Sequence, residues 1–423
     1  MPVPRFSTAS VRISISAKSN GKYSMTQVVI VGAGPTGATL ALLLVKRGIR
    51  TTLIEAAKDS YRVFRGEGLM PSGLDAIAQM GLSPMLESIP HRQIDAWEFI
   101  LGDRQLFRVD EPMGSNRPCT LVSQPPLLEA LIAEAQLHPE FEFISGVPVK
   151  DLLWNGDRIS GVKLADGREI SATLVIGTDG RNSIVRQRAG LDLVTQEKSI
   201  DVLWFKLAAH PRFVADNVFY SILNNGSGFS VFHGAEDGKL HLAWVLDAED
   251  KTDRKHADWA ETFASLSPAW MAEHFRNSQD TIESPMRLSV VVGRCPCWHR
   301  PGIILLGDAA HPMSPVRAQG INMAFRDVIV AANHLVPLLK TEANFGDIDL
   351  ALSRIQAERE PEIIRAQQLQ AQEAWKGEQL RNNGFVRLLM MQVAPFLGDR
   401  IKQFWVKGQY ELRQGVTEVR LIV

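Results

Sequence analysis

The chain has 423 residues, with 46 Lys and Arg against 47 Asp and Glu and a formal net charge of -1. Its length predicts two or three domains at about 150 residues each, and its 45% hydrophobic and 22% charged residues are typical of a globular protein. The balanced charge argues against nucleic acid as a partner, and the three cysteines are too few for a disulfide framework. We expect a protein of a reducing compartment, the cytoplasm, with no metal site.

Residues 1–24 form a distinct basic segment, with four Lys or Arg side chains and no acidic one. This composition is typical of an organelle-targeting peptide, but it also suits an unstructured tail or a start placed too early. We expect a tail, and the segment has no apolar stretch of the kind that directs secretion.

Residues 28–45 carry no charge and come close to the length of a membrane span. Glycines divide this stretch into a strand and a helix, because it contains the run Gly32-Ala-Gly34-Pro35-Thr36-Gly37. Gly32 allows a tight turn, Gly34 lets a pyrophosphate approach the backbone, and Gly37 lets the helix pack on the strand. We therefore expect phosphates at the start of this helix and no integral membrane segment.

A second strand is predicted over residues 49–54, and it ends at Glu55, 23 residues after Gly32. A carboxylate at this position can accept hydrogen bonds from the hydroxyl groups of a ribose. Strand, glycines, helix, strand and acidic residue together predict a bound dinucleotide. NAD and FAD share this unit, so it does not choose between them.

Two later motifs place an aspartate directly after a buried strand. Asp179 follows the apolar run 174–178, and Asp308 follows residues 303–307 and precedes an apolar helix over residues 323–335. With these three motifs in this order, residues 25–345 resemble the single-component (class A) FAD-dependent aromatic hydroxylases, the family of para-hydroxybenzoate hydroxylase and phenol hydroxylase. The resemblance selects FAD as the bound cofactor.

The resemblance implies an α/β fold, in which a Rossmann-like FAD-binding domain of the glutathione-reductase type carries an inserted antiparallel substrate sheet and C-terminal helices. The FAD-binding domain is expected in three parts, residues 25–95, 119–195 and 285–345. The substrate sheet is expected in two parts, residues 96–118 and 196–284. The helical region then covers residues 346–423.

Further FAD-binding positions follow from the resemblance. Asp308 is expected to bind a ribityl hydroxyl, and the backbone N–H groups of Ile321 and Asn322 are expected to face the pyrimidine end of the flavin. Asp179 is expected where the flavin and nicotinamide routes meet, acting mainly through its backbone. The remaining expected cofactor contacts come from Arg65, Gln124 and Gly320.

Residues 200–248 alternate between apolar and polar side chains, which predicts an antiparallel sheet with hairpins. In the family such a sheet closes one side of the substrate pocket, with the flavin on the other. Trp204, Tyr220 and His233 are our candidates for contact with the substrate. For each of them the alternative is a place in the packed layer on the other face of the sheet.

The resemblance implies a monooxygenase that uses NADH or NADPH and O2 to hydroxylate an aromatic or polyketide-like small molecule through a flavin C4a-hydroperoxide. Glu67 is the candidate catalytic base, because it stands where phenol hydroxylase has an aspartate beside the substrate hydroxyl. The alternative for Glu67 is a solvated loop residue. Competing functions are an FAD-dependent dehydrogenase or redox-neutral cyclase of the same fold, a halogenase, and a sensor without turnover.

Three features leave alternatives open. Arg317 and Ala318 stand where the family usually has small residues, so the arginine either crowds the loop over the flavin or contacts an acidic substrate. His311 either supports its loop or transfers a proton. Residues 385–397 are apolar and either pack over the substrate sheet, form a dimer or dock on a membrane surface, so a monomer and a homodimer are both compatible with the sequence.

Overall fold

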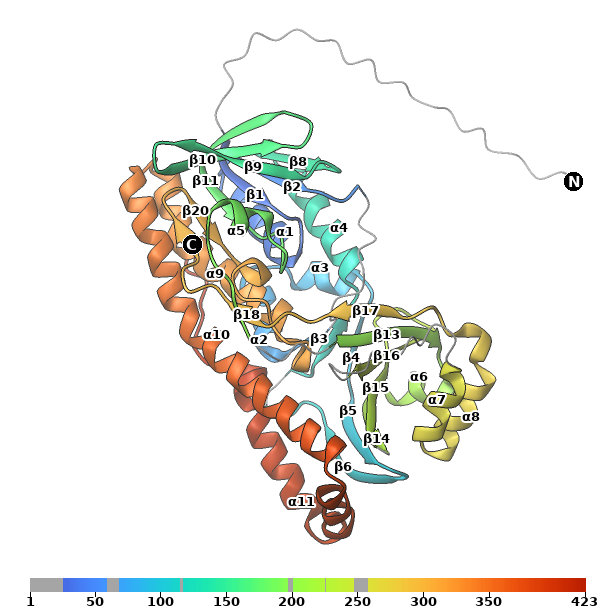
Figure 1. Cartoon of the computed structure of the whole chain (residues 1–423). Coiled ribbons are helices and arrows are strands. Elements are labelled where there is room, and N and C mark those ends of the chain that lie inside the picture. The colour runs from blue at the N-terminus through green and yellow to red at the C-terminus, as the bar shows by residue number, and fades with distance from the viewer. Residues whose placement is uncertain (1–25, 59–67, 115–116, 197–200, 225, 247–257) are drawn as a thin grey trace, which may run out of the picture.

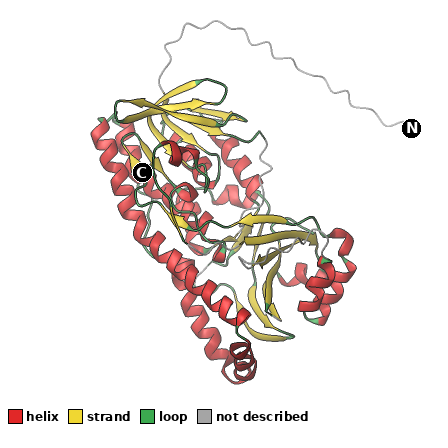
Figure 2. Ribbon diagram, in the orientation of Figure 1, coloured by secondary structure: helices red, strands yellow, loops and turns green. Residues whose placement is uncertain are grey.

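The computed structural model describes residues 26–58, 68–114, 117–196, 201–224, 226–246 and 258–423. It contains two large sheets, and the long helix α10 (Phe345–Asn382) runs from the first sheet toward the second (Figure 1). Figure 2 shows helices packed beside both sheets. The predicted α/β fold with a second, inserted sheet is confirmed.

The first sheet has a parallel centre with the strand order β20-β11-β1-β2-β8. Val31 pairs with both Ile54 and Gly177, so the residues that follow each of these strands lie at one edge of the sheet. This is the edge where open parallel sheets bind ligands. Its strands are β1 (Thr26–Val31), β2 (Thr51–Glu55), β8 (Phe141–Ser145), β11 (Glu169–Gly177) and β20 (Ile303–Leu305), extended antiparallel by β9 (Val149–Asn155), β10 (Arg158–Leu164) and β19 (His299–Arg300).

Both faces of the first sheet are covered, which explains the unbroken apolar run of β1. Val28 and Ile30 face a core shared with several helices, and Val29 and Val31 face a second core formed with β9 and β10. The helices of the first core include α1 (Pro35–Val45), α4 (Gln124–Ala135), α9 (Gln319–Lys340) and the start of α10.

The second sheet has the order β17-β13-β16-β15-β14-β5-β6 and is antiparallel except for the parallel pair of β14 and β5. It joins two separate stretches of chain, residues 96–110 and 201–289. Met286 pairs with Trp204, so β17 belongs to this sheet, whereas the sequence predicts a part of the FAD-binding domain from residue 285 onward. The strands are β5 (Ala96–Leu101), β6 (Arg104–Asp110), β13 (Asp201–Ala208), β14 (Val218–Asn224), β15 (Ser227–His233), β16 (Lys239–Leu246) and β17 (Met286–Ser289).

The two faces of the second sheet have different neighbours. Helices α6 (Pro211–Asp216), α7 (Trp259–Leu266) and α8 (Ala269–Asn277) cover one face, which forms a core of its own. The other face contributes Trp97 and Phe232 to an aromatic cluster that also contains Met70 and Leu121. These two residues belong to the part of the chain built around the first sheet, which we call the first domain. The second sheet therefore meets the first domain through aromatic side chains.

Helix α11 (Gly384–Gln414) follows α10 after Asn383, whose side chain accepts the N–H groups of Phe385 at 3.1 Å and Val386 at 3.2 Å. Trp405 on α11 packs against the second sheet, with its ring centre 4.9 Å from that of Phe99. Residues 415–423 leave the helix and return to the first domain. The predicted helical region therefore ends before the last residue of the chain.

The remaining elements are short. A three-stranded sheet contains β3 (Gly68–Leu69), β4 (His91–Gln93) and β7 (Thr120–Val122), and a two-stranded one contains β12 (Val194–Thr195) and β18 (Gly293–Arg294). The other helices are α2 (Pro71–Gln79), α3 (Ser83–Ser88), α5 (Ile184–Arg188) and the 3-10 turns η2 (Gln279–Thr281), η3 (Gly307–Ala309) and η4 (Val316–Ala318). None of the helices in the described part of the chain has the length and apolar character needed to cross a membrane.

Candidate functional site

A cavity of about 440 Å³ lies at the carboxyl edge of the first sheet and reaches Leu288 and Val290 beside the second sheet. A hollow of about 540 Å³ also occurs beside Lys46 and Leu82, but it holds none of the predicted site residues. The predicted cofactor residues that line the cavity are Gly32, Gly34, Pro35, Thr36, Glu55, Gln124, Asp179, Asp308, Gly320 and Ile321. Residues far apart in sequence therefore meet at one site.

Two glycines in the segment after β1, Gly32 and Gly37, leave no room for a side chain. Gly32 has a φ of 101°, and a Cβ on it would lie 2.6 Å from the carbonyl oxygen of Thr178. A Cβ on Gly37 would lie 2.0 Å from the carbonyl oxygen of Gly32, which explains why Gly37 packs beneath the loop and does not line the cavity. Thr178 Oγ1 donates to that same Gly32 oxygen at 2.7 Å, so β11 holds the loop in place.

Helix α1 starts directly at the cavity. Gly34 is its N-cap residue and Pro35 opens its first turn, and neither adds a side-chain hydrogen bond to the helix end. The helix dipole and the N–H groups of the first turn favour an anion at this position. The start of α1 is therefore suited to a pyrophosphate.

Glu55 uses both carboxylate oxygens to order the backbone around it. Oε2 accepts the N–H of Ala33 at 2.8 Å, and Oε1 accepts the N–H of Ala57 at 3.0 Å. These bonds fasten the end of β2 to the glycine loop. Because a carboxylate can accept about four hydrogen bonds, Glu55 has capacity left for the hydroxyl groups of a ribose.

Asp179 stabilises the turn that follows β11. Its Oδ1 accepts a hydrogen bond from the Ser183 hydroxyl, and its Oδ2 accepts the N–H of Val185 at 3.1 Å. Burial raises the pKa of Asp179. The side chain thus holds the turn whose residues line the cavity.

Arg186, to which we assigned no role from the sequence, joins the Asp179 turn to the Asp308 turn. Its Nη2 donates to the carbonyl oxygen of Arg181 at 2.7 Å, and its Nη1 donates to that of Ala309 at 2.9 Å. The guanidinium is buried. The available sequence signal was a basic residue shortly after the Asp179 turn, and it did not show which carbonyl groups the arginine would reach.

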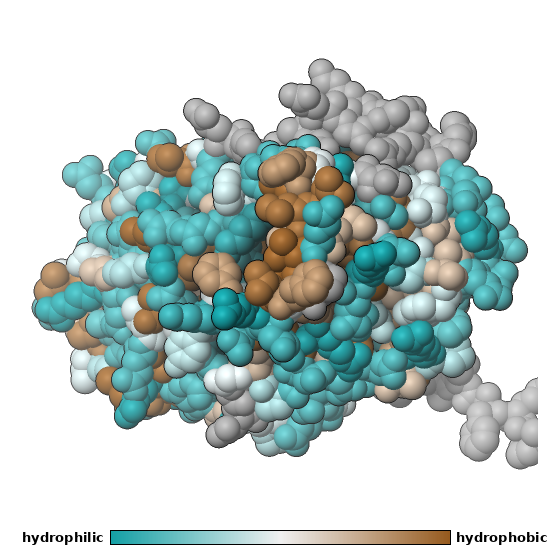
Figure 3. Space-filling view, turned by 90° about the horizontal axis from the view of Figure 1, so that it is seen from below, coloured by the Kyte–Doolittle hydropathy of each residue, from teal (hydrophilic) through white to brown (hydrophobic). Residues whose placement is uncertain are grey.

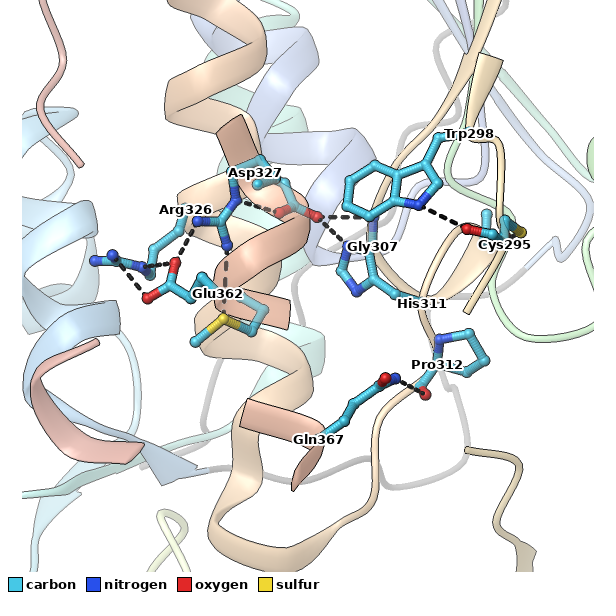
Figure 4. A network of polar contacts seen from close by, with 12 residues as sticks. Cys295, Trp298, Gly307, His311, Pro312, Arg326, Asp327, Glu362 and Gln367 are labelled. Atoms are coloured by element: carbon cyan, nitrogen blue, oxygen red, sulfur yellow. Dashed lines mark hydrogen bonds and ion pairs between the residues drawn. The ribbon is translucent and has the colours of Figure 1, made fainter. Parts of the chain in front are cut away.

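A buried ion network holds the residue before Asp308 (Figure 4). Asp327 accepts the N–H of Gly307 at 3.0 Å through Oδ2, which also lies 2.7 Å from His311 Nε2. Its Oδ1 accepts a hydrogen bond from Arg359 Nε at 2.8 Å. Burial opposes ionisation of Asp327, but His311 and Arg359 outweigh it and lower its pKa to about 2.

The same network extends along α10. Arg359 also pairs with Glu362, and Arg326 Nε donates to Glu362 at 2.9 Å. His311 is fully buried and does not line the cavity, so it supports the loop. The signal that the sequence offered was the charged pair of Arg326 and Asp327 inside an otherwise apolar helix.

The first turn of α9 brings Gly320 and Ile321 to the cavity. The side chain of Asn322 points elsewhere. Its Nδ2 donates to the carbonyl oxygens of Gly68 at 3.1 Å and Ala318 at 2.7 Å, and its Oδ1 accepts the N–H of Met70 at 2.8 Å. Asn322 therefore ties β3 to the start of α9.

Arg317 extends toward the second sheet and α11. Its guanidinium carbon lies 5.1 Å from the ring centre of Trp97 and 4.7 Å from that of Trp405, and its Nη2 lies 3.6 Å from a Glu373 carboxylate oxygen. Arg317 and Ala318 both have left-handed backbones, with φ of 59° and 50°. Because Ala318 lines the cavity, Arg317 joins the cavity loop to the C-terminal helices.

The three candidate substrate residues do not share one face of the second sheet. Trp204 belongs to the aromatic cluster facing the first domain, and its ring centre lies 6.1 Å from that of Phe232. Tyr220 is buried on the helix-covered face, with its ring centre 5.4 Å from that of Phe213.

His233 is also directed to the helix-covered face. It lies two residues after Val231 on β15 and pairs with Leu240, and both of these residues belong to the core of that face. The structure therefore does not place Tyr220 or His233 beside Trp204. The physical reason is the two-residue period of the strand, which sends these positions to the layer covered by helices.

Arg65 and Glu67 lie outside the described residues. The neighbouring residue Gly68 is described, and a Cβ on it would lie 3.1 Å from the Ala318 Cβ. The segment that carries Glu67 thus leads directly to a residue beside the cavity lining.

The residues present fit FAD. A glycine loop without space for side chains, an open helix start, Glu55 and Asp308 are gathered along one cavity. These groups suit a pyrophosphate, a ribose and a ribityl chain in that order. Within the described residues no group of His, Cys, Asp and Glu side chains could hold a metal ion.

Comparisons with known sequences agree with this assignment. A family model described as an FAD binding domain matches residues 25–361. The 6-methylpretetramide 4-monooxygenase of Streptomyces rimosus is 31% identical over 359 residues, which cover 82% of this chain and 84% of that protein. Para-nitrophenol 4-monooxygenase of a Pseudomonas species is 26% identical over 355 residues, covering 76% of this chain and 80% of that protein.

Solved structures share the fold. The crystal structure of p-nitrophenol 4-monooxygenase PnpA from Pseudomonas putida has a TM-score of 0.75 at 18% identity, covering 93% of this chain and 99% of that one. PqsL of P. aeruginosa, crystallised with 2-aminobenzoylacetate, has a TM-score of 0.72 at 21% identity, covering 82% of this chain and 95% of that one. The whole two-sheet architecture is therefore common to these chains.

Proposed function

The chain belongs to the FAD-binding domain family and is an FAD-dependent monooxygenase, and on this basis we propose that it hydroxylates an aromatic or polyketide-like small molecule with electrons from NADH or NADPH. The observation that carries the proposal is the single cavity where the glycine loop, Glu55, Asp179 and Asp308 meet beside the second sheet. The relatives named above act on 6-methylpretetramide and para-nitrophenol. A substrate with an aromatic ring agrees with the aromatic cluster on the facing sheet.

FAD, when bound, supplies the redox chemistry and the activation of O2. The residues of this chain bind and orient it: the start of α1 holds the pyrophosphate, Glu55 the ribose, and Asp308 the ribityl chain. Gln124 and the start of α9 also line the cavity.

The second sheet serves as the substrate platform in this proposal. Trp204, Phe219 and Phe232 present rings to the first domain, and the Phe219 and Phe232 ring centres lie 4.9 Å apart. Aromatic side chains suit a planar aromatic ring. Their apolar surface also keeps water from the reacting atoms.

Glu67 is our proposed catalytic base, which takes the proton from a phenolic hydroxyl so that the ring becomes electron-rich. Its support is the resemblance and the position of Gly68 beside Ala318. Replacement of Glu67 by Gln is expected to lower kcat about 100-fold or more, in the range of a lost general base. The matched control Glu87→Gln changes an exposed helix residue and is expected to leave kcat unchanged. Equal turnover of both variants would remove Glu67 from the mechanism.

The decisive assay measures O2 uptake and NAD(P)H oxidation together over a panel of phenols and polyketides, with mass spectrometry of the product. We expect one O2 consumed per NAD(P)H and a product heavier by one oxygen atom. Substrate oxidation without oxygen insertion would indicate a dehydrogenase. A product isomeric with the substrate would indicate a redox-neutral cyclase. Light scattering of the purified protein distinguishes a monomer from a homodimer, both of which agree with the proposal.

A further inference from the structure

The first half of α11 carries large apolar side chains that the described part of the chain leaves exposed to solvent. We define the α11 patch as Phe385, Leu388, Leu389 and Phe396, which are 73%, 56%, 48% and 87% exposed. Figure 3, seen from below, shows apolar side chains gathered at the end of the molecule where α10 meets α11 in Figure 1. A contiguous apolar area of this kind marks an interaction surface.

Phe385, Leu388 and Leu389 share one side of α11, because their spacings of three and four residues return to the same face of a helix. Phe396, the fourth residue of the patch, is the most exposed of them. The helix is anchored elsewhere. Further along α11, Trp405 and Val406 pack into the aromatic cluster beneath the second sheet, and Leu412 is buried. The patch is therefore held outward by a helix whose other end is fixed in the core.

The surroundings of the patch are strongly basic. Residues 376–408 carry six basic side chains against two acidic ones, a net charge of +4 in a chain whose total is -1. Arg400 and Lys407 are exposed on the second half of α11. Lys376, from the end of α10, lies 5.6 Å from the ring centre of the exposed Phe404.

The positive charge around the α11 patch indicates which partner binds it. A second copy joined through the α11 patch would place the same basic segment on both sides of the interface, where like charges repel. Residues 1–24 of the chain itself carry four basic and no acidic side chains, so they are repelled as well. A surface that offers both hydrocarbon and negative charge matches the apolar side chains and the cations together.

We propose that the α11 patch docks this protein on the surface of a bilayer containing anionic phospholipid. Phe385 and Phe396 enter the boundary between headgroups and acyl chains, and Arg400 and Lys407 bind the lipid phosphates. Since α11 also packs on the aromatic face of the second sheet, docking brings that face close to the lipid. The proposal does not depend on the proposed reaction, because lipid binding is measured without turnover.

The test is flotation of the FAD-loaded full-length protein with vesicles of phosphatidylcholine containing 30% phosphatidylglycerol. We expect binding that weakens as salt is raised from about 0.05 to 0.5 M, because salt screens surface charges. Vesicles of phosphatidylcholine alone are expected to bind at least about tenfold more weakly. The double variant Phe385→Ser, Phe396→Ser is expected to lose binding, and Arg400→Gln, Lys407→Gln to weaken it about 25-fold, at about fivefold per cation.

The matched control Leu137→Ser removes another exposed leucine, which is 76% exposed on the first domain, and is expected to bind vesicles like the parent. The changed side chains are all exposed, so FAD content and thermal stability are expected to stay unchanged, and both are measured. Absence of vesicle binding by the stable parent would overturn the proposal. A parent dimer that the Phe385 and Phe396 changes convert to a monomer would assign the patch to a second copy and overturn it as well.

Discussion

The backbone N–H of Gly307 donates a 3.0 Å hydrogen bond to the fully buried carboxylate of Asp327. Gly307 precedes Asp308, which lines the cavity, and its φ of 58° holds the chain in a left-handed turn. Asp327 is fixed in turn by Arg359 from α10. A charged residue that does not reach the cavity thus sets the position of a cavity residue.

Replacement of Asp327 by Asn removes the charge that faces Arg359. Breaking a buried ion pair costs about 3–5 kcal/mol of unfolding free energy, because a charge is left without its partner. Glu362 still pairs with Arg359 in this variant, so we expect a loss near the lower end of that range. Urea unfolding measures this loss, and flavin-fluorescence titration is expected to show weaker FAD binding. The control Glu358→Gln removes a surface partner of His334 and is expected to cost at most about 1 kcal/mol. Equal losses for both would contradict the role of the network.

Replacement of Glu55 by Gln is expected to weaken FAD binding about 10- to 100-fold. Hydrogen bonds to a charged acceptor contribute about 1.5–3 kcal/mol, and an amide cannot accept from both Ala33 and Ala57. The dissociation constant is measured by titrating the apoprotein with FAD. The partly exposed residue Glu134, paired with Lys46 at 2.9 Å, provides the control Glu134→Gln, for which no change in FAD affinity is expected.

Replacement of Arg317 by Met retains much of the side-chain volume and removes the cation between Trp97 and Trp405. We expect faster hydrogen exchange in α11, because the cavity loop no longer binds the helix, and a loss of about 2 kcal/mol in unfolding free energy. Arg317→Lys keeps the charge and is expected to restore part of the protection. If α11 exchanges at the parent rate in the Met variant, the proposed coupling of loop and helix is wrong.

Acid is expected to destabilise the protein partly through His233. Burial and then the charge of Arg92 lower the pKa of His233 from 6.5 to about 4. The unfolded chain therefore binds a proton at His233 more tightly than the folded protein does. The contribution of neutral His233 to the free energy of unfolding is complete above pH 6.5 and is lost as pH falls toward about 4. Urea midpoints compared between pH 7.5 and pH 5 are expected to differ less for His233→Gln than for the parent. The pKa of Asp327, lowered to about 2, adds a separate loss only below about pH 4.

Trp204 and Tyr220 test which face of the second sheet binds substrate. Trp204→Ala is expected to raise the substrate KM about tenfold, through lost ring stacking of about 1.4 kcal/mol. Tyr220→Phe alters a hydroxyl on the helix-covered face and is expected to leave KM unchanged. The reverse result would place the substrate on the helix-covered side of the sheet.

Local sequence was sufficient to predict the first domain and to select residues that line one cavity. The glycines, Glu55, Asp179 and Asp308 each lie at or just after the end of a strand of the same parallel sheet, and the ends of parallel strands meet at one edge. Each of these motifs consists of residues that are adjacent in sequence, so it can be recognised without the tertiary structure. The inserted sheet was implied by the resemblance to the aromatic hydroxylases and by the alternation of apolar and polar side chains over residues 200–248.

Only the tertiary structure decided the rest. The alternation of apolar and polar side chains showed that Trp204 and Tyr220 each point to one face of a strand. The packing of α6, α7 and α8 determines which face of the sheet the helices cover. The hydrogen bond between Asp327 and Arg359, which lie 32 positions apart in the sequence, depends on where α10 lies. The contact of Arg317 with Trp405 likewise depends on where α11 lies. Contacts between distant segments arise from the packing of whole elements, so no local pattern encodes them, and the same is true of the side of α11 that is left exposed.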